Sequence, residues 1–237
     1  MSDAASAIAI EDLRFRWQPT RDWVLDIPRL AIARGESVFL AGPSGSGKTS
    51  LLSLITGIAQ PTEGCVRILD TRIDHLRGAA RDRFRADHFG IVFQLFNLLP
   101  YLSVLENVLL SCEFSAARAQ RAARRSGTPA GEAVRLLGRL GLTDPQLHRR
   151  PATELSVGQQ QRVAAARALI GSPPVIVADE PTSALDADLR TEFVTLLLQE
   201  VVEAGSALLF VSHDRQLAAA FDREVDLRRF APAPTPP

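Results

Sequence analysis

The sequence contains almost no lysine, no long apolar run and no surplus of either charge. Lysine occurs once, at Lys48, although Lys and Arg together number 27. The net charge is zero, which argues against a polybasic nucleic-acid binder. No stretch reaches about 18 consecutive apolar residues, and the N-terminal stretch lacks the basic-then-apolar layout of a signal peptide. We therefore expect no nucleic-acid partner, no transmembrane span and no leader.

Cysteine is also scarce, and the basic residues cluster at only one place. Cys65 and Cys112 match no metal-binding spacing, so we expect buried free thiols in a reducing compartment. The run from Arg118 to Arg125 fits either a solvated helix face or a patch that docks a partner or lipid headgroups. The proline-rich segment 231–237 is expected to be disordered.

The remaining composition is that of an ordinary globular protein, and its patterns divide the chain into three parts. The chain has 237 residues, of which 46% are hydrophobic, enough for one large domain. Strand patterns dominate up to Gln94, beginning with two separate early strands at 8–10 and 13–17. Helical patterns then take over, and Ser103 and Ser156 have the sequence of helix N-caps. Apolar runs suited to buried parallel strands return near residues 175 and 207.

These patterns predict a single α/β domain that is interrupted by a helical insertion. No internal repeat and no coiled-coil heptad run is visible. We place the boundaries as follows: the whole domain at 1–230, its core at 1–94 and 171–230, and its helical subdomain at 95–170.

A phosphate-binding loop is the feature around which the chain is organised. An apolar strand pattern precedes it and a helix pattern follows, which is the context that the G-x-x-x-x-G-K-[ST] motif requires. Glycines let successive backbone N–H groups face an anion, and the helix N-terminus adds partial positive charge. A chance Gly/Ser-rich turn is the alternative. The residues that we expect to hold nucleotide phosphates here are Gly42, Pro43, Ser44, Gly45, Ser46, Gly47, Lys48, Thr49 and Ser50.

Two acidic residues follow the apolar run 175–178. Asp179 could hold Mg²⁺ together with the Thr49 hydroxyl, and Glu180 could act as the base that orients an attacking water. Taken alone, an Asp-Glu pair after a strand could equally be the turn that starts a helix.

A second anion-binding device lies at Leu155-Ser156-Val157-Gly158-Gln159, where a serine hydroxyl and backbone N–H groups meet at a helix N-terminus. With this motif the chain resembles the ATP-binding-cassette (ABC) ATPases over about residues 8–230. The resemblance also rests on the phosphate loop and on the strand ending at Glu180. Two further motifs carry it, Ser183-Ala184-Leu185-Asp186 and Ser212-His213-Asp214.

The resemblance implies a P-loop NTPase fold of the ABC type. It has a mainly parallel sheet, an antiparallel β subdomain and a helical subdomain insertion. It implies ATP and Mg²⁺ as ligands, and a second copy of the chain that completes each site in a nucleotide-sandwich dimer. The implied roles are as follows: Glu180 as catalytic base, His213 on the γ-phosphate, Gln94 on Mg²⁺ and the water, Trp17 on adenine in place of the usual Tyr, Asp186 at the dimer interface, and Ser156, Gly158 and Gln159 on the opposite nucleotide.

One position departs from the family pattern, because Val157 replaces the second residue of the usual Ser-Gly-Gly-Gln. A β-branched residue would be strained at positive φ. In ordinary helix it lowers helix propensity by only a few tenths of a kcal/mol, roughly. We expect the signature motif to be active. The rate of ATP turnover would depend on whether the valine has positive φ or ordinary helical backbone.

The subfamily is suggested by Phe93-Gln94-Leu95-Phe96-Asn97-Leu98-Leu99-Pro100 and by the stretch 105–108, which look like the lipoprotein-release and macrolide-export cassettes. This resemblance implies a peripheral subunit on the cytoplasmic face of the cell membrane that powers an integral permease. An importer ATPase and a soluble Fe–S assembly ATPase are the alternatives. A small P-loop kinase has no use for the motif that begins at Leu155.

An apolar cluster directly follows Gln94. Phe96, Leu98, Leu99 and Tyr101 could form the surface that docks on a permease, or they could be buried in the helical subdomain. Exposure in the folded chain separates the two hypotheses.

Overall fold

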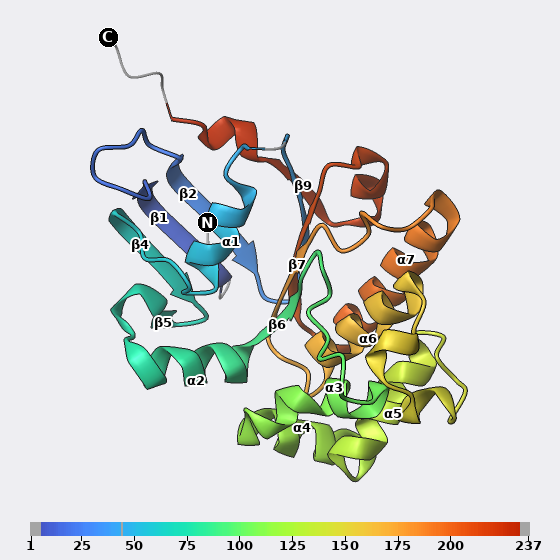
Figure 1. The fold of residues 1–237 in the computed structure, drawn as a ribbon. Helices are drawn as coiled ribbons and strands as arrows, with labels where there is room; N and C mark the ends of the chain where they lie inside the picture. The colour runs from blue at the N-terminus through green and yellow to red at the C-terminus, as the bar shows by residue number, and fades with distance from the viewer. Residues whose placement is uncertain (1–5, 44, 233–237) are drawn as a thin grey trace.

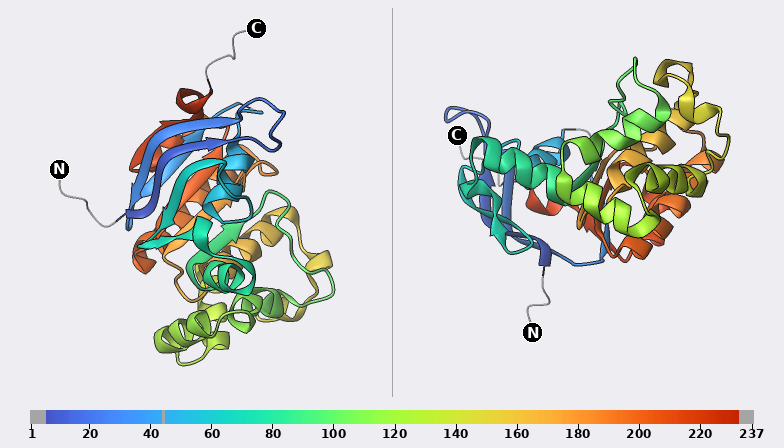
Figure 2. Two further views of the ribbon diagram at one scale, coloured as in Figure 1. Left: turned by 90° about the vertical axis from the view of Figure 1, so that its left-hand side faces the viewer. Right: turned by 90° about the horizontal axis from the view of Figure 1, so that it is seen from below.

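The computed structural model describes residues 6–43 and 45–232, which form two β-sheets and a cluster of helices (Figure 1). The antiparallel sheet lies on one side of the parallel sheet, and most of the helices lie on the other side. Seen from below, the antiparallel sheet and the cluster of helices α3 to α7 lie at opposite ends of the molecule (Figure 2, right). Ser44 and the residues 233–237 of the proline-rich segment were part of our expectations, but they lie outside the described residues.

The parallel sheet carries the functional loops at the carboxyl ends of its strands. Its strand order is β6-β7-β8-β3-β9, and all of its neighbouring pairs are parallel. Side chains alternate between its two faces, as Phe39 and Leu40 do in β3, and both faces are buried. The strands are β3 (Ser37–Ala41), β6 (Phe89–Val92), β7 (Val175–Asp179), β8 (Ala207–Ser212) and β9 (Arg223–Asp226).

The antiparallel sheet has the order β2-β1-β4-β5. Its strands are β1 (Ser6–Phe15), β2 (Leu25–Ala33), β4 (Glu63–Ile68) and β5 (Thr71–Arg72). The prediction of two early strands was wrong, because β1 is continuous. The polar residues that suggested a break form an irregularity instead. Asp12 takes a φ of 48°, and the pairing with β4 shifts register between Glu11 and Arg14.

Seven α-helices and five short 3₁₀ helices are described. The α-helices are α1 (Lys48–Ile55), α2 (Gly78–His88), α3 (Val104–Glu113), α4 (Ala116–Ser126), α5 (Pro129–Arg139), α6 (Val157–Leu169) and α7 (Ala187–Ala204). The 3₁₀ helices are η1 (Ile73–His75), η2 (Leu147–Arg149), η3 (Ala152–Glu154), η4 (Arg215–Ala220) and η5 (Leu227–Phe230). None of the described helices is both long and apolar enough to cross a membrane.

Two hydrophobic clusters fix these layers. One fills the space between the antiparallel sheet, α1 and one face of the parallel sheet, and includes Ile10 and Leu51. The other lies under α3, α5, α6 and α7 on the opposite face, and includes Phe193. The helix starts predicted from the sequence are confirmed at Ser103 and Ser156, and each of these forms a complete capping box.

Two arginines of the basic run from Arg118 to Arg125 belong to neither a solvated face nor a free patch. Arg118 is only 3% exposed, and its guanidinium donates to the carbonyls of Phe89, Arg167, Ala168 and Ile170. Burial lowers its pKa to about 10. Arg121 donates to the carbonyls of Gly171 and Asp87. Both sequence interpretations were wrong at these two positions, because the arginines satisfy orphan carbonyls at the end of α6 and fasten α4 to the core.

A candidate nucleotide pocket at the carboxyl end of the sheet

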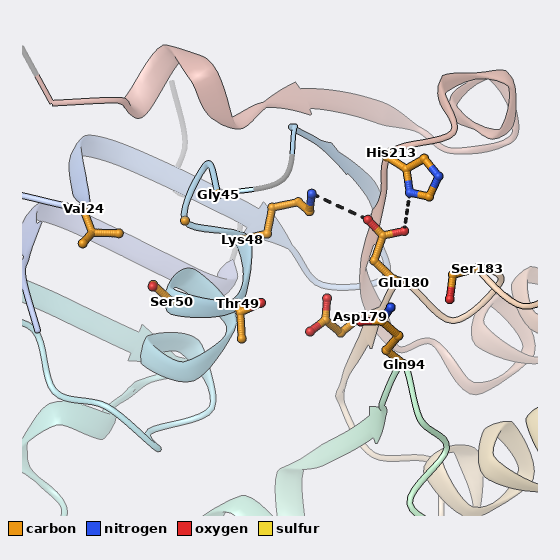
Figure 3. A pocket seen from close by; sticks show the side chains of 11 residues that line it. Val24, Gly45, Lys48, Thr49, Ser50, Gln94, Asp179, Glu180, Ser183 and His213 are labelled. Atoms are coloured by element: carbon orange, nitrogen blue, oxygen red, sulfur yellow. Dashed lines mark hydrogen bonds and ion pairs between the residues drawn. The ribbon is translucent and has the colours of Figure 1, made fainter.

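One pocket of about 450 Å³ collects residues from five separate segments of the chain (Figure 3). The loop after β3 and the start of α1 form one wall. Gln94 follows β6, Asp179 and Glu180 end β7, and His213 follows β8. The carboxyl ends of parallel strands meet at one sheet edge, which is where ligands of open α/β sheets bind.

The phosphate loop has the backbone of an anion cradle. Gly47 precedes α1 with a φ of 92°, and no side chain caps the N–H groups of this helix. A Cβ at Gly47 would lie 2.8 Å from a Leu25 methyl carbon, and a Cβ at Gly42 would lie 2.6 Å from the Ser46 hydroxyl oxygen. Glycine is therefore required at position 47, a side chain at position 42 would displace the Ser46 hydroxyl, and the open N-terminus of α1 presents donors to the pocket.

An unsatisfied hydroxyl in this loop tests whether a phosphate fits. The Ser46 Oγ is buried and has no hydrogen-bond partner among the described residues. A buried hydroxyl without a partner costs roughly 1–3 kcal/mol, and a phosphate oxygen is a strong acceptor. The loop is therefore built for an anionic ligand that would pair with this group.

Lys48 reaches into the pocket and already has partners there. Its Nζ donates to the carbonyls of Gly42, at 2.7 Å, and Pro43, at 3.2 Å, and it lies 3.6 Å from a Glu180 carboxylate oxygen. The side chain is only 11% exposed. The single ammonium of the chain is thus held with its charge toward the pocket.

Glu180 lies between two cationic or potentially cationic partners. Its second carboxylate oxygen accepts a hydrogen bond from His213 Nδ1 at 2.9 Å, and the Glu180 side chain is 13% exposed. The backbone at Glu180 takes a φ of 45°, which is uncommon for a residue with a side chain. Strained backbone of this kind persists where surrounding contacts hold it, and it is concentrated at functional sites.

Asp179 faces the space next to Thr49 and Gln94. Burial, followed by the neighbouring charge of Glu180, raises the pKa of the Asp179 carboxyl above its usual range. A divalent cation would oppose that shift by stabilising the charged form. The carboxylate, hydroxyl and amide oxygens present here fit Mg²⁺, which takes few protein ligands, and the described residues contain no larger His/Cys/Asp/Glu cluster that could hold a metal.

A tight turn follows Gln94 and is held from the helical subdomain. Phe96 and Asn97 have φ values of 59° and 50°. The guanidinium of Arg167, on α6, donates to the Phe96 carbonyl at 2.6 Å and to the Asn97 carbonyl at 2.7 Å. Since α6 begins at Ser156, one side chain joins the Gln94 segment to the helix that carries the second anion-binding motif.

Trp17 lies in a neighbouring hollow of about 660 Å³, which shares Val24 and Gly45 with the main pocket. Its indole Nε1 donates to the Ser50 hydroxyl at 3.3 Å, and the residue is 60% exposed. The rings of Trp17 and Phe15 pack edge to face, and their centroids are 5.0 Å apart. The alternative of a core aromatic is wrong, because Trp17 presents a free ring surface beside the phosphate loop.

The residues assigned to the dimer interface and the opposite nucleotide do not line the pocket of this single chain, namely Ser156, Gly158, Gln159 and Asp186. The Asp186 side chain caps α7 by accepting from Leu189 N–H at 3.0 Å. Val157 is the first residue of α6 and does not have positive φ, so the strain considered for it is absent. Its side chain remains 46% exposed.

Sequence reasoning missed two residues that line the pocket, Val24 and Ser183. Ser183 was part of a recognised motif, and its position three residues after Glu180 was the signal available. Val24 carried no chemical signal. A second missed feature is Trp23, whose ring is covered by the guanidinium groups of Arg14 and Arg16, 4.1 Å and 4.4 Å from its centroid.

Comparison with known proteins identifies a family model and several proteins that this chain resembles. Residues 25–183 match the family model described as ABC transporter. The lipoprotein-releasing system ATP-binding protein LolD of Syntrophotalea carbinolica is 40% identical, over 96% of this chain and 97% of that protein. The macrolide export ATP-binding/permease protein MacB of Photorhabdus laumondii is 39% identical, over 86% of this chain.

The share of each relative that is covered differs widely. The chain spans 30% of that MacB protein, and it spans 60% of an uncharacterised ABC transporter ATP-binding protein of Mycobacterium tuberculosis that is 41% identical. Among solved structures, the dimeric post-hydrolysis state of the ATP-binding cassette MJ0796, bound to ADP and Pi, has a TM-score of 0.77. It is 34% identical over 92% of this chain and 93% of that chain.

Proposed function

This chain belongs to the ABC transporter family and carries its ATPase cassette, and from that premise we propose that it hydrolyses ATP to power a membrane permease of the lipoprotein-release or macrolide-export kind. The observation that carries the proposal is the convergence of Lys48, Asp179, Glu180 and His213 on one pocket. ABC importers and Fe–S assembly ATPases use the same pocket chemistry, and the permease partner distinguishes them.

Phosphate binding is assigned to the loop from Gly42 to Ser50. Open N–H groups at the start of α1, the unpaired Ser46 hydroxyl and the Lys48 ammonium would surround the β- and γ-phosphates. Thr49, Gln94 and Asp179 would hold Mg²⁺, which when bound neutralises charge on the phosphate oxygens.

Glu180 is assigned as the base that orients the attacking water. The Glu180 carboxylate is shared between Lys48 and His213. A γ-phosphate would offer Lys48 and His213 a more strongly charged partner, so both would turn from Glu180 and leave its carboxylate free to accept the proton of water.

The remaining nucleotide contacts are assigned to other parts of the chain and to a second copy. Trp17 would stack on adenine, which its free ring surface and its position beside Ser50 support. Ser156, Gly158, Gln159 and Asp186 would act on the nucleotide of the second copy in a sandwich dimer. Their position outside the pocket supports this assignment, as do dimeric cassettes among the solved relatives.

The permease partner would dock at a groove of about 360 Å³ between α2, β6, α3 and α6. Its lining includes the apolar residues Ile91, Phe93 and Leu110, with Phe114 76% exposed at the rim. The groove also contains Asn97 and Arg167, so an occupant would touch the clamped turn that follows Gln94. We propose that the subunit lies on the cytoplasmic face of the cell membrane, which its similarity to ATP-binding proteins of export and lipoprotein-release systems supports.

The apolar cluster after Gln94 was expected either to dock on a permease or to be buried in the helical subdomain, and its residues do not all fit one of these hypotheses. Phe96 is buried and Leu98 packs against the helical core, so replacing either would destabilise the fold. Tyr101 is 76% exposed and remains available to a partner, although it does not line the groove.

Docking predicts that Phe114→Glu abolishes co-purification with the permease but leaves folding and basal ATP hydrolysis intact. The residue follows α3 and is exposed, so a carboxylate there costs little in the isolated chain but opposes an apolar contact. Detergent extracts from cells that express the chain with a candidate permease give the measurement, by affinity purification and phosphate release.

The matched control is Val202→Glu, at a 73% exposed apolar residue on α7, which should co-purify normally. Equal loss in both variants would point to a general surface effect. Retention of the permease by Phe114→Glu would place the docking surface elsewhere, and retention of no membrane protein by the unaltered chain would favour the soluble alternative.

A further inference from the structure

Arg190 joins Leu185 and Asp214, which follow residues of the pocket but do not line it themselves. It is in the first turn of α7, directly after the turn that follows Glu180. One terminal nitrogen of its guanidinium donates to the Leu185 carbonyl at 3.0 Å, and the other forms an ion pair with the Asp214 carboxylate. Leu185 and Asp214 are 29 positions apart in the sequence, so this bridge is a tertiary contact.

Each bridged segment begins at a residue of the proposed catalytic pair. The turn from Glu180 to Leu185 is stepwise hydrogen-bonded, since Ser183 N–H donates to the Glu180 carbonyl and Leu185 N–H donates to the Thr182 carbonyl. Asp214 directly follows His213. With the His213–Glu180 hydrogen bond, the Arg190 bridge closes a ring of contacts around the two functional side chains.

The pair has few other supports. The His213 side chain is 67% exposed, and within the described part of the chain its hydrogen bond is the one to Glu180. Glu180 has the uncommon φ of 45°. Asp214 is held in place by further bonds, because its N–H donates to the Ser212 hydroxyl and its carboxylate accepts from Gln216 N–H. Because Asp214 is fixed in this way, Arg190, which it holds, also fixes the turn after Glu180.

We infer that Arg190 is a positioning residue for ATP hydrolysis, which holds Glu180 and His213 in register by clamping the segments that follow them. The inference rests on the proposed function of Glu180. Arginine is required because its planar fork reaches a carbonyl and a carboxylate at once, which a lysine ammonium at one point cannot do. The Nε of Arg190 is buried without a hydrogen-bond partner among the described residues. The side chain therefore makes this bridge although one of its donors stays unsatisfied.

The test measures kcat, ATP affinity and thermal stability in Arg190→Gln, Arg190→Lys and Asp214→Asn. We expect Arg190→Gln to lower kcat by roughly 10- to 100-fold, because small misplacements of catalytic groups have effects of this size. The affinity for ATP should change less than twofold, roughly, because the phosphate loop is untouched. Arg190→Lys should recover only part of the lost kcat.

A double-mutant cycle separates positioning from a general structural effect. Asp214→Asn removes the charge and keeps the side-chain shape, so it tests the bridge even where Arg190→Gln folds poorly. The double variant should have about the same kcat as the worse single variant, because the two residues act as one unit. Additive losses in kcat would overturn the inference.

The matched control is Arg215→Gln. Arg215 is the next residue after Asp214, but its guanidinium forms ion pairs with Asp226 and Glu224, away from the turn after Glu180. Its kcat should be unchanged. An unchanged kcat in Arg190→Gln, together with inactive Glu180→Gln, would refute the positioning role alone. Full activity in Glu180→Gln would instead refute the proposed function on which it rests.

Discussion

Lys48→Ala abolishes tight Mg-ATP binding and turnover, since the chain has no other lysine to replace it. Charge-assisted hydrogen bonds contribute about 1.5–3 kcal/mol each, so losing contacts to two phosphates weakens binding by at least roughly a hundredfold. Isothermal titration with ATP in the presence of Mg²⁺ measures the loss directly, and a phosphate-release assay measures turnover.

Lys48→Arg should fail as well, although it keeps the charge. The lysine side chain is 11% exposed, and its Nζ is enclosed by the carbonyls of Gly42 and Pro43 and by Glu180. A guanidinium is broader and needs a planar fork of acceptors, which this enclosure does not offer. Arg34→Ala, which removes an exposed cation paired with Asp70, serves as the control and should bind ATP normally. Near-normal hydrolysis by Lys48→Arg would contradict the assignment of Lys48.

Glu180→Gln lowers turnover by roughly 10²–10⁴-fold while ATP still binds, because the amide cannot accept the proton of the attacking water. The change is isosteric, and the left-handed backbone at this position is unaffected by charge. With hydrolysis blocked, the variant should accumulate as an ATP-bound dimer. Size-exclusion chromatography with and without ATP, beside a phosphate-release assay, gives both results.

The control for Glu180→Gln is Glu192→Gln. Glu192 is 52% exposed on α7, where it pairs with Arg162, and its loss should change neither turnover nor elution volume. A monomeric Glu180→Gln protein with full turnover would mean that another group orients the water.

Local signals predicted the helices and the phosphate loop well. The capping boxes at Ser103 and Ser156 depend on residues three positions apart, so the sequence itself contains both partners. The pocket was also accessible to sequence reasoning, because strand ends of a parallel sheet necessarily meet at one edge.

Contacts between distant segments were beyond that reasoning. Arg118 resembled a solvated charge, and only the fold shows that the end of α6 leaves carbonyls for it to satisfy. Strand β9 was not predicted, since Arg223, Glu224 and Asp226 dominate its sequence and it is stabilised by pairing with β3 at the sheet edge. The Arg190 bridge joins residues that no short-range pattern connects.

Because the chain has a single lysine, a protease that cleaves only after lysine can cut it only in the phosphate loop. The bond between Lys48 and Thr49 lies in the first turn of α1, and the side chain that such a protease must recognise is held inward. Cleavage therefore requires that this turn open, and it yields just two fragments, which separate at residue 48. The rate at which the fragments appear would measure how often the loop opens locally. Bound ATP should lower this rate.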